Sequence, residues 1–130
     1  MNIYLDIDGV LITKDNSPAD YVVDFLKYIT DNHDVYWLTT HCQGDAQTTI
    51  LYLKDKLPND AIPFLKKIKA TKWQTLKTEA IDFSKNFRWL DDYIMQAERN
   101  VLIKNNTLNK FILIDLKNNP EILKNLMAVL

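Results

Sequence analysis

The stretch NIYLDIDGV, residues 2–10, joins a short apolar run to two aspartates and a glycine. Its apolar and β-prone residues predict a strand over residues 3–7 that is buried on both faces of a sheet. Asp6 and Asp8 then fall at the carboxyl end of that strand, and Gly9 follows where the chain must turn. A buried strand that delivers carboxylates to one edge of a sheet is the first sign of a site.

Outward from this stretch, apolar runs alternate with helical stripes. Further strands are predicted at Val35–Leu38, Ile62–Ile68, Phe87–Leu90 and Phe111–Ile114. Helices are predicted at Ala19–Ile29 with a Ser17-Pro18 start, and at Asp45–Lys56, Trp73–Phe83, Ile94–Ile103 and Pro120–Leu130. Pro63 places the weaker strand, Ile62–Ile68, at a sheet edge. This alternation predicts an α/β fold, a three-layer Rossmann-like sandwich around a central five-stranded, mostly parallel sheet.

Length and composition limit the chain to a modest range of functions. The 130 residues fit a single domain, residues 1–130, with 47% hydrophobic residues for its core. The net charge of -1 excludes a global attraction to nucleic acid.

Cys42 is the single cysteine, so no intramolecular disulfide can form and we expect no disulfide-linked partner. No signal-peptide pattern or long apolar run is present, which predicts a cytoplasmic protein without a membrane partner.

Polar residues follow three of the predicted buried strands. Asp6 and Asp8 follow the first, Thr39 follows the second, and Asp91 and Asp92 follow the strand at Phe87–Leu90. Ligands of open parallel sheets bind outside the carboxyl ends of the strands, so we expect these groups to converge. Four carboxylates would repel one another without a cation, and an all-oxygen set favours Mg²⁺, an ion often shared with a substrate phosphate.

Three motifs resemble the haloacid dehalogenase (HAD) superfamily. DIDGV at residues 6–10 resembles its first motif, an Asp-x-Asp-x-Thr/Val pattern after a hydrophobic strand. VYWLT at residues 35–39 resembles the second motif, and RWLDD at residues 88–92 resembles the fourth, an apolar strand that ends in an acidic pair. The motifs occur in the family's order, which implies a HAD-like fold and a Mg²⁺-dependent phosphatase.

The resemblance implies a role for each carboxylate. Asp6 would be the nucleophile that forms an aspartyl-phosphate, and Asp8 would protonate the leaving group and then deprotonate water. Asp6, the Asp8 backbone carbonyl and Asp91 would bind Mg²⁺, with Asp92 as an additional or outer ligand.

The phosphate contacts implied by the family come from the first two motifs. Thr39 would donate a hydrogen bond to a phosphate oxygen, assisted by the backbone amide of Thr40. Gly9 would let the chain turn sharply beside the phosphate. His41 follows Thr39 closely and is a candidate for lining the site.

The third motif of the family requires a lysine before the acidic strand, and three lysines are available. Lys77 is preferred because KTEAI at residues 77–81 has the family's Lys-x-x-Ala-Ile form. Lys72 lies nearer the predicted helix start and is retained as a substrate-binding alternative, and Lys69 is also available.

The family often carries a cap domain, for which this chain has no room. Leu11–Pro18 is long enough only for a β-hairpin flap. An open site is associated in the superfamily with macromolecular or nucleotide substrates, so the expected partner is a phosphorylated small molecule, protein or nucleic-acid end. Two alternatives stand beside the phosphatase: a catalytically weak HAD-like binding or regulatory module linked to nucleic-acid repair, and a response-regulator-type domain, whose different motif order argues against it.

Overall fold

The structure, a computed structural model, describes all residues 1–130 and is an α/β fold around one parallel sheet. The sheet has four strands in the order β2-β1-β3-β4, and every neighbouring pair is parallel. The strands are β1 (Asn2–Leu5), β2 (Asp34–Trp37), β3 (Phe87–Asp91) and β4 (Phe111–Leu113). The α-helices are α1 (Val22–Asn32), α2 (Gln47–Leu53), α3 (Ile62–Leu65), α4 (Gln96–Lys104) and α5 (Ile122–Met127), and 3₁₀ turns form at η1 (Asn59–Ala61), η2 (Lys77–Ala80) and η3 (Leu108–Lys110).

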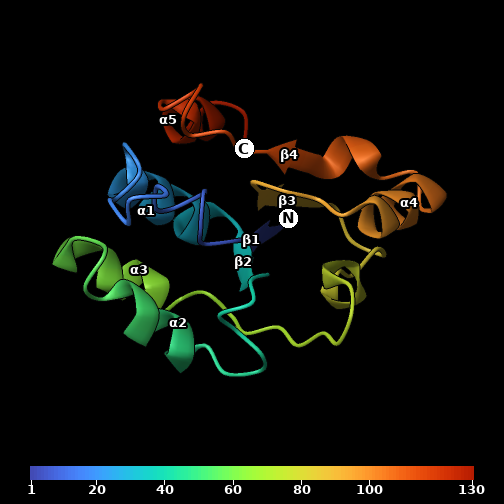
Figure 1. Cartoon of the computed structure of the whole chain (residues 1–130), viewed down its shortest axis with the longest axis horizontal. Helices are drawn as coiled ribbons and strands as arrows, with labels where there is room; N and C mark the ends of the chain where they lie inside the picture. Colours follow the sequence, from blue (N-terminus) through green and yellow to red (C-terminus); the bar gives the residue numbers. More distant parts are fainter.

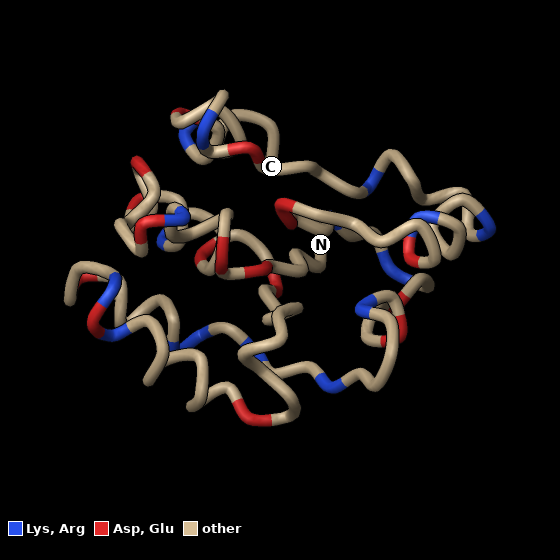
Figure 2. Tube along the Cα trace, viewed as in Figure 1, with Lys and Arg blue, Asp and Glu red and all other residues tan.

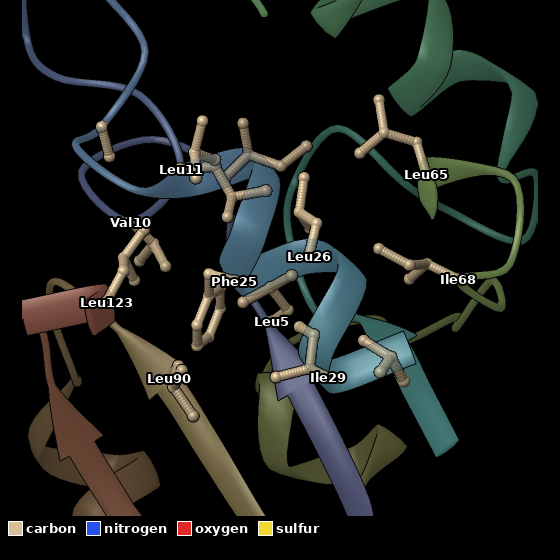
Figure 3. Packing of buried hydrophobic residues seen from close by; sticks show 14 of the residues in the cluster. Leu5, Val10, Leu11, Phe25, Leu26, Ile29, Leu65, Ile68, Leu90 and Leu123 are labelled. Carbon is tan, nitrogen blue, oxygen red and sulfur yellow. The ribbon is translucent and has the colours of Figure 1, made fainter. Parts of the chain in front are cut away.

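Alternate residues of β1 enter two hydrophobic cores on opposite faces of the sheet. Ile3 and Leu5 belong to the larger core, which α1, α3 and α5 cover, whereas Tyr4 belongs to the smaller core beside α4 (Figure 1). Figure 3 shows Phe25 and Ile29 of α1 packed toward Leu5 and Leu90 of the sheet. Burial on both faces explains why β1 is an almost continuous apolar run.

The expected fifth strand, Ile62–Ile68, is wrong. Those residues form α3 and the turn after it, with Pro63 in the first helical turn, where its missing N–H costs nothing. Leu65 and Ile68, three residues apart, both enter the larger core, as a helical turn allows. The next residue, Lys69, forms an isolated parallel bridge to Tyr36 of β2.

The expected helix Trp73–Phe83 is also wrong, apart from the 3₁₀ turn η2. The carboxylate of Glu79 accepts hydrogen bonds from the backbone N–H groups of Gln74, Thr75 and Leu76, at 3.1, 3.2 and 2.7 Å. A side chain therefore satisfies the amides that a helix would have left unpaired in its first turn. The segment instead lays Trp73 and Phe83 against the smaller core.

The start of α1 differs from the expected Ser17-Pro18 cap. Ile12 and Pro18 form an antiparallel bridge, and the amide of Ala19 donates to the carbonyl of Leu11 at 2.9 Å. This compact hairpin-like flap holds Pro18 outside the helix. The helix begins only after Tyr21, whose φ of 63° turns the chain toward α1.

Candidate active site

The central position of β1 brings the predicted site residues to one edge of the sheet. The amide of Asp6 donates to the carbonyl of Leu90 on β3 at 3.1 Å, and the amide of Leu38 donates to the carbonyl of Leu5 at 2.8 Å. The ends of β1, β2 and β3 are thereby held side by side. The polar residues that follow these strands share the carboxyl edge, where ligands of parallel sheets bind.

Three carboxylates converge at this edge: Asp6, Asp91 and Asp92. One oxygen from each lies within 4.8 Å of the others. Asp6 and Asp91 are buried, at 8% and 1% exposure, whereas Asp92 is exposed. The donors are all oxygens, the chemistry that Mg²⁺ prefers, and buried carboxyl groups need a cation or a proton to offset their charge. The residues present therefore fit a hard divalent ion. Because Asp92 is exposed, such an ion could reach the cluster from solvent.

Lys77 supplies a cation to this acidic cluster from η2. Its Nζ lies 2.7 Å from Asp91 Oδ2 and 3.7 Å from Asp6 Oδ1. Burial alone would lower the pKa of Lys77, but the charges on Asp6 and Asp91 outweigh burial and raise it. Lys77 is therefore held firmly as an ammonium ion.

Asp91 is the most strongly perturbed acid in the chain. Burial and the neighbouring charge on Asp6 raise its pKa to about 8, although the Lys77 ammonium acts in the opposite direction. Trp89 Nε1 donates to Asp91 Oδ2 and the amide of Tyr93 donates to Oδ1, both at 3.3 Å. Asp91 therefore holds its proton more tightly than an exposed aspartate does, and a metal ion bound there would have to displace that proton.

Glu98, which sequence reasoning did not identify, fixes the position of Lys77. Its buried carboxylate accepts from the amide of Lys77 at 2.8 Å and from the amide of Met95 at 3.0 Å. Glu98 is the third residue of α4, the position at which a glutamate commonly bonds back to the helix start. The sequence signal for Glu98 is its place three residues after the helix N-cap, Met95. The acidic pair before α4 does not cap it, because its N-cap is Met95.

Gly9 allows the flap to approach the acidic cluster. Its φ of 78° lies in the left-handed region, and a Cβ built there would meet the side chain of Asp92, with Cγ 2.7 Å and Cβ 2.8 Å away. A larger residue would therefore displace Asp92 from the cluster.

The carboxylate of Asp8 is not part of this cluster. Its carboxylate is about half exposed, with His41 Nε2 at 2.7 Å from Oδ2 and the Tyr52 hydroxyl donating to Oδ1 at 2.8 Å. Burial and the hydrogen bond to Asp8 raise the pKa of Tyr52, so its hydroxyl stays protonated. Tyr52 was not anticipated, because it comes from α2, far from Asp8 in sequence.

The remaining predicted residues occupy different places. Thr39 is fully buried after β2 and its Oγ1 accepts from the amide of His41 at 3.3 Å, whereas Thr40 is exposed. Lys72 lies beside Gly44, and Lys69 Nζ lies 3.5 Å from Asp34 Oδ1 at the start of β2.

Of the three lysines considered for the third motif, Lys77 is the one that contacts the carboxylates of the cluster. Lys69 is ruled out of such contact because Asp34 begins β2, at the opposite end of the sheet.

A cleft opens beside the cluster between the flap and the segment after β4. Its volume is about 750 Å³, and it is lined by Gly9, Thr13, Lys14, Asp15, Asp92 and residues 113–118. Basic and acidic residues are interspersed along the whole trace (Figure 2).

Comparisons with protein-family models, with curated protein sequences and with solved structures found no match to this chain. None of its helices combines the length and the apolar character needed to cross a membrane.

Proposed function

We propose that this protein is a Mg²⁺-dependent phosphatase that hydrolyses phosphate monoesters through a phosphorylated Asp6. The observation that carries the proposal is the Lys77 ammonium shared between Asp6 and Asp91 at the carboxyl edge of the sheet. A cation there counters the charge of both a carboxylate nucleophile and an incoming phosphate. The order of the three motifs supports the same reading, and we propose a HAD-like fold with three layers.

In the first half-reaction, an oxygen of Asp6 attacks phosphorus and the bond to the leaving oxygen breaks. Asp8 gives its proton to that oxygen. In the second half-reaction, Asp8 takes a proton from water as the water attacks phosphorus and the bond to Asp6 breaks. Each catalytic group returns to its starting state, and the products are an alcohol and inorganic phosphate.

Other residues bind the phosphate and hold charge. Thr39 and the amide of Thr40 are the proposed donors to phosphate oxygens, and Lys77 holds Asp6 as a carboxylate. The Asp8 carbonyl and the carboxylates of Asp6, Asp91 and Asp92 would hold Mg²⁺. When bound, the ion withdraws charge from the phosphate oxygens as a Lewis acid.

The test is hydrolysis of p-nitrophenyl phosphate with and without Mg²⁺, for wild type and Asp6→Asn. We expect Mg²⁺-dependent turnover that falls by at least about a thousandfold in the variant, because the nucleophile is lost. Asp34→Asn, at the start of β2 and the opposite end of the sheet, is the matched control and should retain turnover.

Turnover unchanged by Asp6→Asn would reject the mechanism. Mg²⁺ binding without turnover on a wide panel of phosphate esters would favour a binding or regulatory module instead. With no large cap over the cleft, the panel begins with nucleotides, nucleic-acid ends and phosphopeptides.

A further inference from the structure

The carboxylate of Asp8 is held by donors from two separate parts of the chain. His41 comes from the turn after β2, and Tyr52 comes from α2. One donor meets each carboxylate oxygen, at 2.7 Å for His41 and 2.8 Å for Tyr52. A side chain about half exposed to solvent is thus fixed at both oxygens, although solvent alone would satisfy its charge.

The two rings are also braced independently of Asp8. They stack with centroids 3.8 Å apart and planes 19° from parallel. The carbonyl of His41 accepts from Thr48 Oγ1 at 2.7 Å, and Lys56 Nζ lies 4.0 Å from the centre of the Tyr52 ring. The stacked pair is therefore a preformed support against which Asp8 rests.

We infer that His41 and Tyr52 are positioning residues for Asp8, which hold its carboxyl group in the orientation used for proton transfer. The inference rests on the proposed phosphatase function and deepens it. A proton donor that is misplaced by a small distance loses much of its effect, so a fixed orientation has catalytic value. In this role the transferred proton is carried by Asp8, and His41 and Tyr52 only orient its carboxyl group.

The hydrogen bonds from His41 and Tyr52 do not prevent Asp8 from transferring a proton. A carboxylate oxygen has two lone pairs, so each oxygen of Asp8 can accept from its partner and still carry or receive a proton. In the first half-reaction that proton passes from Asp8 to the leaving oxygen. In the second half-reaction it is replaced by a proton of the attacking water.

A general acid matters most when the leaving group is poor, which separates positioning from a structural role. p-Nitrophenolate departs readily without protonation, whereas unsubstituted phenolate benefits more from an incoming proton. Misplacing Asp8 must therefore slow phenyl phosphate more than p-nitrophenyl phosphate. A general loss of folding or of phosphate binding slows both esters alike.

The variants His41→Phe and Tyr52→Phe each remove one donor and retain a ring for the stack. In the double variant we expect kcat for phenyl phosphate to fall by about tenfold more than kcat for p-nitrophenyl phosphate. His41→Gln carries an amide N–H in place of the ring N–H. It is expected to recover much of the kcat for phenyl phosphate that His41→Phe loses. Tyr28→Phe on α1 is the matched control, because Tyr28 packs against His33 at the other end of the sheet.

Equal losses on the two esters in an otherwise active enzyme would overturn the inference alone. Faster hydrolysis of phenyl phosphate by the double variant would also overturn it, because His41 and Tyr52 would then restrain Asp8 unproductively. Wild type that hydrolyses neither ester, with Asp6→Asn no different, would reject the proposed function and this inference together.

Discussion

Asp6 and Asp8 are two residues apart at the end of one strand, yet they lie in opposite electrostatic settings. Asp6 is buried with Asp91 and depends on the Lys77 ammonium for compensation. Asp8 is about half exposed and is held by side chains of α2 and the turn before it. A charge removed from water needs a partner of opposite charge. An exposed charge is solvated by water, so its hydrogen-bond partners mainly fix its orientation. The buried side should therefore control stability and metal binding, and the exposed side should control rate.

The largest expected effect comes from removing the cation on the buried side. Lys77→Met leaves the buried Asp6 carboxylate without its positive partner and removes the hydrogen bond from Nζ to Asp91, so in Mg²⁺-free buffer the free energy of unfolding should fall by about 3 kcal/mol. Urea denaturation measures this loss, and Mg²⁺ should recover part of it by supplying a replacement charge.

Lys72→Met is the matched control, because Lys72 forms no ion pair in the structure and the substitution should leave unfolding almost unchanged. If the two substitutions destabilised equally, the buried acids would not depend on Lys77.

A smaller effect is expected where the flap meets the cluster. Gly9→Ala forces a residue with a Cβ into a left-handed conformation, which costs about 1–2 kcal/mol, and its Cβ displaces the side chain of Asp92. Both stability and Mg²⁺ affinity should fall, as measured by denaturation and calorimetry.

Gly44→Ala separates these two consequences. Gly44 also has a positive φ, 87°, but the nearest atom to a Cβ there is Lys72 Cδ at 3.7 Å, an ordinary contact. It should lose similar stability and keep its Mg²⁺ affinity. A loss of affinity in both variants would refute the role given to Asp92.

Proton release on Mg²⁺ binding tests the protonation state of the buried Asp91. With its pKa raised to about 8, Asp91 is largely protonated at neutral pH without metal, so Mg²⁺ binding should release about one proton. Calorimetry in buffers of different ionisation enthalpy measures this release. Asp91→Asn should abolish it, and Mg²⁺ binding by wild type without proton release would contradict the prediction.

The same group gives a pH dependence of stability. A carboxyl whose folded pKa is raised stabilises the fold fully below its unfolded value of 3.8, and this contribution is lost as pH rises to about 8. In metal-free protein, the contribution of Asp91 to the free energy of unfolding should therefore fall as the pH rises from 3.8 to about 8. Denaturation with Mg²⁺ should show a smaller loss, because the metal takes the place of the proton.

The strands with continuous apolar runs were predictable, and the intervals between them were less so. β1 and β3 were predicted because burial on both faces leaves little choice of residue. Ile62–Ile68 was misjudged because a short apolar run suits either a strand or a buried helical turn. The residues around η2 were misjudged because Glu79 satisfies the amides that were assigned to a helix.

The site divides in the same way. Asp6, Asp91 and Asp92 could be grouped from sequence, because parallel strands must bring their carboxyl ends together. Tyr52 could not, because its contact with Asp8 depends on how α2 packs after β2, and no local pattern encodes that. Contacts between side chains of loops and helices arise only in three dimensions.

The smallest expected effect is on the stability of the exposed side. Tyr52→Phe removes one hydrogen bond to a carboxylate that water can solvate, and it keeps the ring stacked on His41. The free energy of unfolding should change by less than about 1 kcal/mol, measured by urea denaturation beside Lys77→Met. A loss as large as that of Lys77→Met would mean that Asp8 is part of the buried charge balance. A small loss, combined with a selective loss of turnover on poor leaving groups, would separate the orientation of Asp8 from the stability of the fold.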